Sequence, residues 1–288
     1  MKENIKVAIY TLLSILFFSI TSYLIPYKFS SYINPLIDTN LLIRIFLIFF
    51  FSISIIIFIK VNKKYNSIIK LNIKEATLLM QFYKIFCNLE YKIRVNAKAL
   101  IDNYIIKILT FKANNLDAFL YDEMDGFYNF LYKIKPKNNT ELKYMDNGLQ
   151  ITREIEEMKN NYIFLNNNKM NSFEKIFLYS TGILSIILIN LLLSLNFEII
   201  IFKVMTSTVI LYIMWYLNSL DNLTINTNLF KFEIYEKVLE QLSLLRYYPE
   251  HYENEYQIPK EIKKYRLGTL NLETKEITIK QIESEENA

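Results

Sequence analysis

Glycine, proline, cysteine and histidine are all scarce in this sequence, and each shortage excludes a class of protein. Only four glycines and five prolines occur among 288 residues, too few to build a glycine-rich loop that cradles nucleotide phosphates. The single cysteine, Cys87, excludes an intramolecular disulfide, and the single histidine, His251, leaves no set of zinc ligands. The sequence also has no Ser/His/Asp arrangement and no HExxH motif. We therefore expect no enzyme, no catalytic residue and no metal or other cofactor.

Hydrophobic runs of bilayer length are what the sequence does have. Hydrophobic residues make up 52% of the chain, and a helix of about 20 apolar residues spans the ~30 Å hydrocarbon core of a bilayer. Four segments reach that length: 7–25, 41–59, 176–195 and 199–217. The first of them is too long for a cleavable signal and should remain as a span. We predict an all-α membrane protein with four transmembrane helices in two hairpins, embedded in the lipid bilayer.

The predicted spans divide the chain into four parts. They are a first transmembrane hairpin (1–59), a helical cytoplasmic insert (60–175), a second transmembrane hairpin (176–218) and a cytoplasmic tail (219–288). Lysines crowd the exit of the second span, at positions 60, 63, 64, 70 and 74, whereas the hairpin tips are poor in basic residues. Because basic residues near span ends are retained on the cytoplasmic side, we expect a protein of the cytoplasmic (inner) membrane with both termini in the cytoplasm.

The second span is predicted to continue far beyond the bilayer. Neither glycine nor proline occurs between Pro35 and Gly126, so one helix can run from Leu41 to about Leu89. A seam along this helix alternates by four and three residues, and its members are Ile69, Ile73, Ala76, Met80, Tyr83 and Cys87. Such a seam packs either inside its own subunit, the interpretation we favour, or against another subunit.

Weaker patterns describe the rest of the insert and the tail. Residues 99–134 are helical by period, 136–148 form a turn-rich break and 149–165 form another helix. Asn171 and Glu174 have the spacing of a capping box that would start the third span. In the tail we predict a helix that ends near Arg246, an irregular stretch with two prolines, and a small β-hairpin over 269–280.

One face of the second span is a candidate pore lining. Its members are Arg44, Leu47, Phe51, Ser54 and Phe58. If this face lined a pore, Arg44 would form a cationic outer mouth, and the two phenylalanines would form a dry constriction. The plainer interpretation is that Arg44 reaches outward to the lipid headgroups, and Lys203 at similar depth in the fourth span supports it. In the third span, Thr181, Gly182 and Ser185 form a small-residue patch for close helix packing, and Asn190 is expected to bond across helices.

The segment after the last span resembles a known family. In "SLDNLTINTNLFKFEIYEKVLEQL" (219–242), Leu220, Asp221 and "FEIYEKVL" are similar to the segment that follows the last span of bestrophin-like bacterial membrane proteins. Asn222, Leu223 and Thr224 stand where that family has a Pro-Phe signature. The stretches "EATLLMQFY" (75–83) and "NGLQITREIEEMKNN" (147–161) also look like helices of the family's insert. The layout resembles that family over most of the chain, with Asp221 as its landmark at the membrane exit.

The resemblance implies a pentameric anion channel with a hydrophobic neck. The partners it implies are further copies of the chain and inorganic anions, and we expect no nucleic acid. Two alternatives stay open. Proton-channel motor subunits of the MotA and ExbB type have a similar layout, but their last two spans look rich in glycine and marked by proline, whereas here those spans contain only Gly182 and no proline. A membrane scaffold or sensor that conducts nothing fits the same features.

Overall fold

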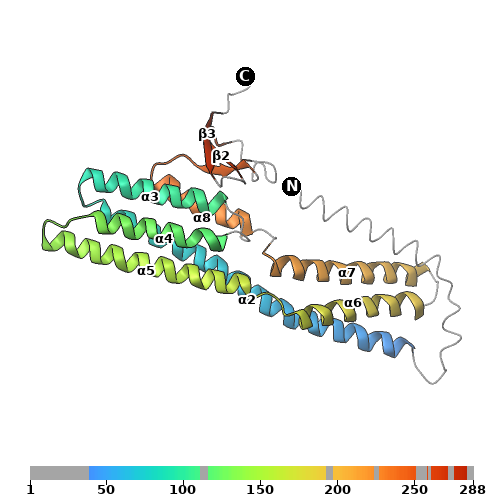
Figure 1. Cartoon of the computed structure of the whole chain (residues 1–288). Coiled ribbons are helices and arrows are strands. Elements are labelled where there is room, and N and C mark those ends of the chain that lie inside the picture. The colour runs from blue at the N-terminus through green and yellow to red at the C-terminus, as the bar shows by residue number, and fades with distance from the viewer. Residues whose placement is uncertain are drawn as a thin grey trace. The chain divides into compact units, whose positions relative to one another are not determined.

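Helices dominate the structure, a computed structural model that describes residues 39–110, 116–192, 197–223, 227–250, 258, 261–271 and 276–283. Figure 1 shows the elements in these ranges. They are α2 (Thr39–Phe86), α3 (Tyr91–Thr110), α4 (Leu116–Lys133), α5 (Asn139–Asn167), α6 (Ser172–Leu192), α7 (Phe197–Asp221), α8 (Thr227–Gln241), β1 (Tyr247–Pro249), β2 (Lys264–Leu270) and β3 (Ile277–Glu283). The predicted helix over 99–134 is therefore described as two helices, α3 and α4.

The chain divides into two compact units, each built from separate stretches of sequence. The first unit comprises residues 1–65 and 169–225, and the second unit comprises residues 66–168 and 226–288. Helix α2 contributes its first part to the first unit and its remainder to the second. No glycine or proline interrupts its 48 residues, so the predicted long helix is confirmed.

Three helices of the described residues are long and apolar enough to cross a membrane. The first stretch is Leu41–Phe86 in α2, and the third is Phe197–Asp221, which is α7. The second stretch is Asn139–Asn190, and its apolar end is α6. We predicted four such helices, and the described part of the chain contains three. The predicted first span, residues 7–25, lies outside the described residues. The three apolar helices fit a membrane protein.

Small side chains bring α6 close to its neighbours in the first unit. A Cβ atom at Gly182 would lie 2.6 Å from Sδ of Met214 in α7 and 3.0 Å from the ring of Phe50 in α2. Ser185, one turn further, is buried, and its hydroxyl donates to the carbonyl of Thr181 at 2.8 Å. The predicted small-residue patch is thus confirmed as the surface on which these helices pack.

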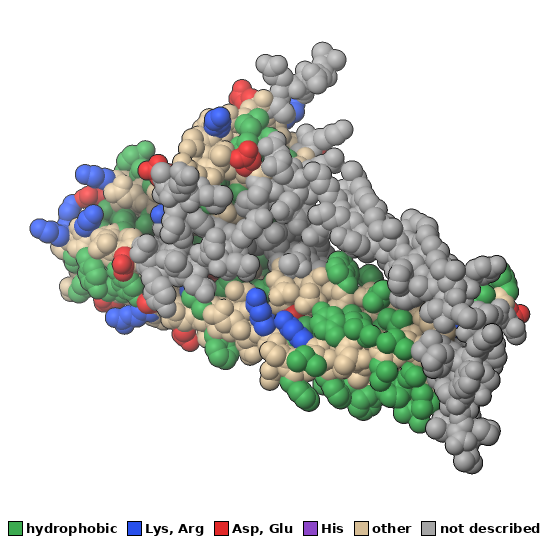
Figure 2. All heavy atoms as spheres, turned by 45° about the vertical axis from the view of Figure 1, so that its right-hand side comes forward, with side chains coloured by type: hydrophobic (Ala, Val, Ile, Leu, Met, Phe, Trp, Pro, Cys, Tyr) green, Lys and Arg blue, Asp and Glu red, His purple; other side chains and the backbone are tan. Residues whose placement is uncertain are grey.

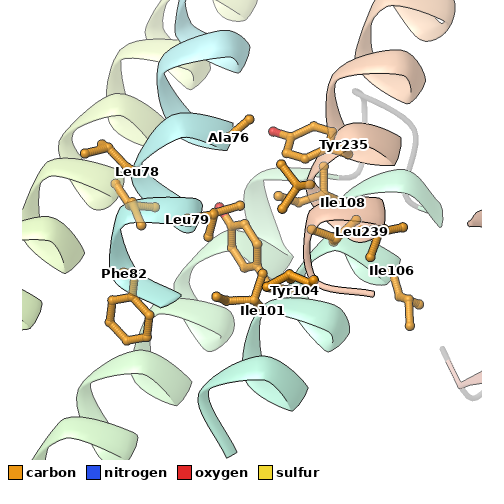
Figure 3. Packing of buried hydrophobic residues seen from close by; sticks show 14 of the residues in the cluster. Ala76, Leu78, Leu79, Phe82, Ile101, Tyr104, Ile106, Ile108, Tyr235 and Leu239 are labelled. Atoms are coloured by element: carbon orange, nitrogen blue, oxygen red, sulfur yellow. The ribbon is translucent and has the colours of Figure 1, made fainter. Parts of the chain in front are cut away.

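A hydrophobic core holds the second unit together. It draws on α2, α3, α4, α5 and α8, and Figure 3 shows the part that contains Ala76, Leu78, Leu79, Phe82, Ile101, Tyr104, Ile106, Ile108, Tyr235 and Leu239. The ring of Phe127 meets Phe82 and Tyr104 edge to face, with centroid distances of 5.1 and 5.3 Å. Aromatic pairs in this geometry add about 0.5–1.5 kcal/mol each to the stabilisation from burial.

The stripe by which α2 enters this core differs from the predicted seam by one residue. Its buried members are Ile68, Asn72, Glu75, Leu79, Phe82 and Phe86. The predicted seam is confirmed in part: Ala76 is buried and Met80 and Tyr83 pack against the core, whereas Ile73 is 50% exposed. The true stripe includes an asparagine and a glutamate, so a search for apolar residues alone selects the neighbouring register.

Helix α5 begins at Asn139, inside the segment predicted as a turn-rich break. The side chain of Asn138 accepts the backbone N–H of Glu141 at 2.8 Å, and the Glu141 carboxylate accepts the N–H of Lys137 at 2.7 Å. These caps satisfy donors at the start of the helix, which explains why turn-forming residues precede it. Gly148 lies within α5, where a Cβ would come within 2.7 Å of the Phe86 ring. This glycine serves close packing and does not mark a turn.

A three-stranded sheet in the order β1-β2-β3 belongs to the second unit. Strands β2 and β3 form an antiparallel hairpin with Leu270 opposite Ile277, so the predicted hairpin is confirmed. Strand β1 pairs in parallel with β2 in a stretch predicted to be irregular, and α8 ends at Gln241, earlier than predicted. A strand of three residues is too short to show an alternating pattern.

The guanidinium of Arg266 in β2 bonds both carboxylate oxygens of Asp102 in α3 at 2.7 Å and so joins sheet and helix.

Candidate functional site: polar groups of the membrane helices

The five residues of the predicted pore lining occupy different environments. Arg44 and Phe58 are exposed, Leu47 and Phe51 are partly buried, and Ser54 is buried. Leu47 and Phe51 pack against the hydrophobic cluster of the first unit, and the Phe58 ring lies 6.4 Å from the ring of Tyr216 in α7. Part of this face therefore packs within the first unit, and Arg44 is its exposed cationic end.

Asp221, the last residue of α7, lies at the centre of a buried charged cluster. Its side chain is 1% exposed. Its carboxylate accepts the backbone N–H of Met170 and lies 3.3 Å from the ammonium of Lys64 in α2 and 3.5 Å from that of Lys175 in α6. Lys64 also donates to the backbone oxygen of Asp221 at 3.0 Å. The cluster fastens the end of α7 to α2 and to the start of α6.

This geometry gives the predicted landmark at the membrane exit a physical role. A buried carboxylate is stable only when charges and donors surround it, and Asp221 has both. Its two oxygens are already engaged by one N–H group and two ammonium groups. The arrangement is that of a structural clamp between three helices.

A second charged group lies at the start of α6. The carboxylate of Glu174 accepts the backbone N–H of Asn171 at 2.9 Å, which confirms the glutamate half of the predicted capping box. The ammonium of Lys60 in α2 also donates to both oxygens of Glu174, at 2.7 and 2.9 Å. The sequence did not indicate this pair, because 114 residues separate its members.

A buried lysine lies between α6 and α7. Lys203 is 1% exposed, and its ammonium donates to the backbone oxygen of Asn190 at 3.1 Å. The Asn190 amide donates to the carbonyl of Ile186 at 2.8 Å and to the hydroxyl of Ser207 at 3.4 Å, so its predicted bond across helices is confirmed. Lys203 was used to support the interpretation that Arg44 reaches the lipid headgroups, and its own side chain is buried and bonded to the backbone. Thr206 and Ser207, three and four residues further along α7, are the sequence signals of a polar face.

The second unit buries a carboxylate of its own. Glu75 accepts hydrogen bonds from the hydroxyls of Tyr104 and Tyr235, and the ammonium of Lys159 lies 3.6 Å from it. That ammonium also lies 4.3 Å from the centroid of the Tyr104 ring. Burial, together with the charge of Glu75, raises the pKa of Tyr235 well above its ordinary value, so the phenol remains a donor. This network joins α2, α3, α5 and α8.

The described residues of α6, α7 and the first-unit part of α2 carry six basic side chains, at positions 44, 60, 63, 64, 175 and 203, and three acids, at positions 174, 198 and 221. In the ranges that the structure describes, no three His, Cys, Asp or Glu side chains are placed to hold a metal ion. Comparisons of the chain with protein-family models, with curated proteins and with solved structures found no match.

Proposed function

We propose that this chain is a multi-pass membrane protein that assembles with copies of itself and conducts inorganic anions. The observation that supports conduction best is Lys203, an ammonium buried between two apolar helices. Ionisable groups inside membrane bundles are costly and mark ion paths. The exposed Arg44 adds a second cation near the start of α2. Rings of such cations, formed by several subunits, attract anions.

The exposed face of α2 supports assembly. Arg44 lies on the first-unit part of α2, whose exposed apolar residues are Leu41, Ile45, Ile48, Phe49, Ile55, Ile56, Phe58 and Ile59. An exposed apolar face in a membrane contacts either lipid or another apolar helix. A pore shared by several copies of the chain requires that part of this face contacts a helix of another copy. Mass photometry of the detergent-purified protein should find oligomers, and monomers alone would refute the assembly.

The distribution of lysines supports the orientation. Lys60, Lys64, Lys169 and Lys175 surround the end of the membrane helices that holds Asp221, and basic residues are retained in the cytoplasm. We therefore place both termini in the cytoplasm and the protein in the inner membrane. A phosphatase reporter that is active only outside the cytoplasm should be silent when fused after Ala288. It should be active when inserted at Ser31.

Chloride flux from proteoliposomes tests conduction. Arg44→Glu and Lys203→Met should lower the flux, whereas Lys203→Arg, which keeps the charge, should retain more of it than Lys203→Met. Phe51→Ala should raise basal leak by widening the predicted constriction. Lys143→Glu is the matched control, because Lys143 is an exposed lysine in the second unit, and its flux should equal that of the wild type.

A scaffold or sensor without conduction is the second candidate. The burial of Ser54 and the contact of Phe58 with Tyr216 favour it, because both residues belong to the predicted pore lining and pack within the subunit. If wild type and Phe51→Ala give neither chloride nor proton flux above empty liposomes, the scaffold or sensor is supported. A proton flux without a chloride flux would instead support a motor subunit of the MotA and ExbB type.

A further inference from the structure

The membrane helices carry an excess of positive charge at the end where Asp221 lies. Five lysines of the described residues lie there, namely Lys60, Lys63, Lys64, Lys169 and Lys175, and two acids, Glu174 and Asp221. Five positive charges less two negative charges leave a net charge of +3 on these residues. Figure 2 shows basic side chains at the border of the large apolar surface of the first unit. A negatively charged partner is therefore favoured at this border.

The acid Asp221 is turned toward the protein and Glu174 is partly exposed, whereas Lys60 and Lys169 are exposed. Asp221 is buried and Glu174 is held by Lys60 and the N–H of Asn171. The side chain of Lys60 is nonetheless 49% exposed, that of Lys175 is partly exposed, and Lys169 is exposed. A partner at this border therefore meets more of the ammonium groups than of the carboxylates.

Exposed apolar side chains occupy the first turns of α6, the helix that also carries Lys175. Phe173 and Ile176, in the first two turns of α6, are 68% and 67% exposed. The Phe173 ring stacks on the ring of Phe177, with a centroid distance of 5.7 Å. Lysines at the end of a span hold their ammonium groups at the headgroup level while their aliphatic stems cover apolar surface. A free anion would need only the lysines, whereas a lipid also uses the apolar surface.

We propose that Lys60, Lys169, Lys175, Phe173 and Ile176 form a binding surface for an anionic phospholipid of the adjacent leaflet. The ammonium groups bind the headgroup phosphate, and an acyl chain lies along the two apolar side chains. The start of α6 adds the partial positive charge of a helix N-terminus. This site depends on α6 lying in the membrane and does not depend on ion conduction.

One tryptophan can report on the site. Trp215 is the only tryptophan of the chain, so Trp215→Phe combined with Phe173→Trp places a single fluorophore in the proposed surface. In liposomes, phosphatidylglycerol brominated in its acyl chains should quench this fluorophore at about one-fifth of the concentration that brominated phosphatidylcholine requires. A fivefold difference in concentration corresponds to the attraction of about 1 kcal/mol between one lysine and an anionic lipid surface.

Substitutions at Lys169 distinguish a specific lipid-binding site from a general attraction of the basic protein to anionic lipid. In the reporter background, Lys169→Gln should remove most of the preference for phosphatidylglycerol, and Lys169→Arg should retain it. Lys143→Gln, at an exposed lysine of α5 in the second unit, should leave the preference unchanged. Equal quenching by the two lipids, or a preference that Lys169→Gln leaves intact, would overturn the proposal. If the protein prefers phosphatidylglycerol but gives no chloride flux, the lipid site is supported and only the proposed anion conduction is refuted.

Discussion

Both carboxylate oxygens of Asp221 lie 3.0 Å from the backbone nitrogen of Met170. The residue that ends α7 is thereby joined to the chain just before α6, across 51 positions of sequence. Hydrogen bonds with a charged acceptor are about twice as strong as neutral ones. Because Lys64 and Lys175 approach the same carboxylate, this one side chain joins the end of α7 to the start of α6 and to the middle of α2.

Removal of that carboxylate should destabilise the membrane helices. Asp221→Ala should lower the free energy of unfolding by about 3–5 kcal/mol, because Lys64 would stay buried without its counter-charge. Asp221→Asn should cost less, since its amide oxygen can still accept the N–H of Met170. Glu198→Ala, at an exposed carboxylate in the first turn of the same helix, should change stability by less than about 0.5 kcal/mol. Denaturant unfolding in detergent, followed by circular dichroism, measures all three, and equal effects of Asp221→Ala and Glu198→Ala would contradict the clamp.

Two glycines should respond in opposite directions to alanine. Gly182→Ala should destabilise the protein by about 1–2 kcal/mol, because the new methyl group would press on the ring of Phe50 and on Met214. At Gly126, within α4, the nearest atom would be Cδ1 of Leu100 at 3.5 Å, an ordinary contact. Gly126→Ala should therefore stabilise its helix by about 0.5–1 kcal/mol. Thermal melts measure both variants, and the melting temperature should fall for Gly182→Ala and rise for Gly126→Ala. A rise for both variants would contradict the close packing at Gly182.

The register of α2 in the second unit can be tested at two nearby positions. Glu75→Ala should cost about 3–5 kcal/mol, because Lys159 and two tyrosine hydroxyls would lose their buried acceptor. Ile73→Glu should change stability little, since Ile73 is exposed in the subunit. Thermal unfolding gives both values. An Ile73→Glu variant that unfolds as early as Glu75→Ala would contradict the observed register, and one that folds but loses its oligomeric state would place the seam between subunits.

The sheet should depend on one buried ion pair and not on an exposed one. Arg266→Ala should cost about 2–3 kcal/mol and speed the hydrogen exchange of β2 amides, because Arg266 bonds Asp102 in α3 and the backbone oxygen of Leu245. Lys264→Ala in the same strand breaks an exposed pair with Glu283 and should cost less than about 1 kcal/mol. Equal protection of the sheet in both variants would show that the Arg266 pair does not hold it in place.

Sequence patterns located most helices because their signals are local. The apolar run that begins α2 and the absence of glycine and proline along it predicted one long helix, and the structure has it from Thr39 to Phe86. The capping glutamate of α6 was also visible, since Asn171 and Glu174 are three residues apart. The same signal, Asn138 with Glu141, marks the start of α5, but the turn-forming residues around it concealed the helix.

The buried polar residues were beyond the reach of pattern reading. Glu75 is buried because Tyr104, Lys159 and Tyr235 supply its partners, and these residues come from three other helices. Without them a glutamate belongs on the surface. The apolar pattern therefore favoured the neighbouring register, in which Ile73 replaces Asn72.

The sequence by itself determined that the chain is helical and that parts of it can enter a membrane, because helix formation and hydrophobicity depend on residues a few positions apart. It also determined that Asp221 stands where an apolar helix ends. The tertiary structure decided what Asp221 does, which way Lys203 turns and which face of α2 is buried. Each of these depends on hydrogen bonds and charges from segments distant in sequence, and a buried polar group is stable only where such partners converge.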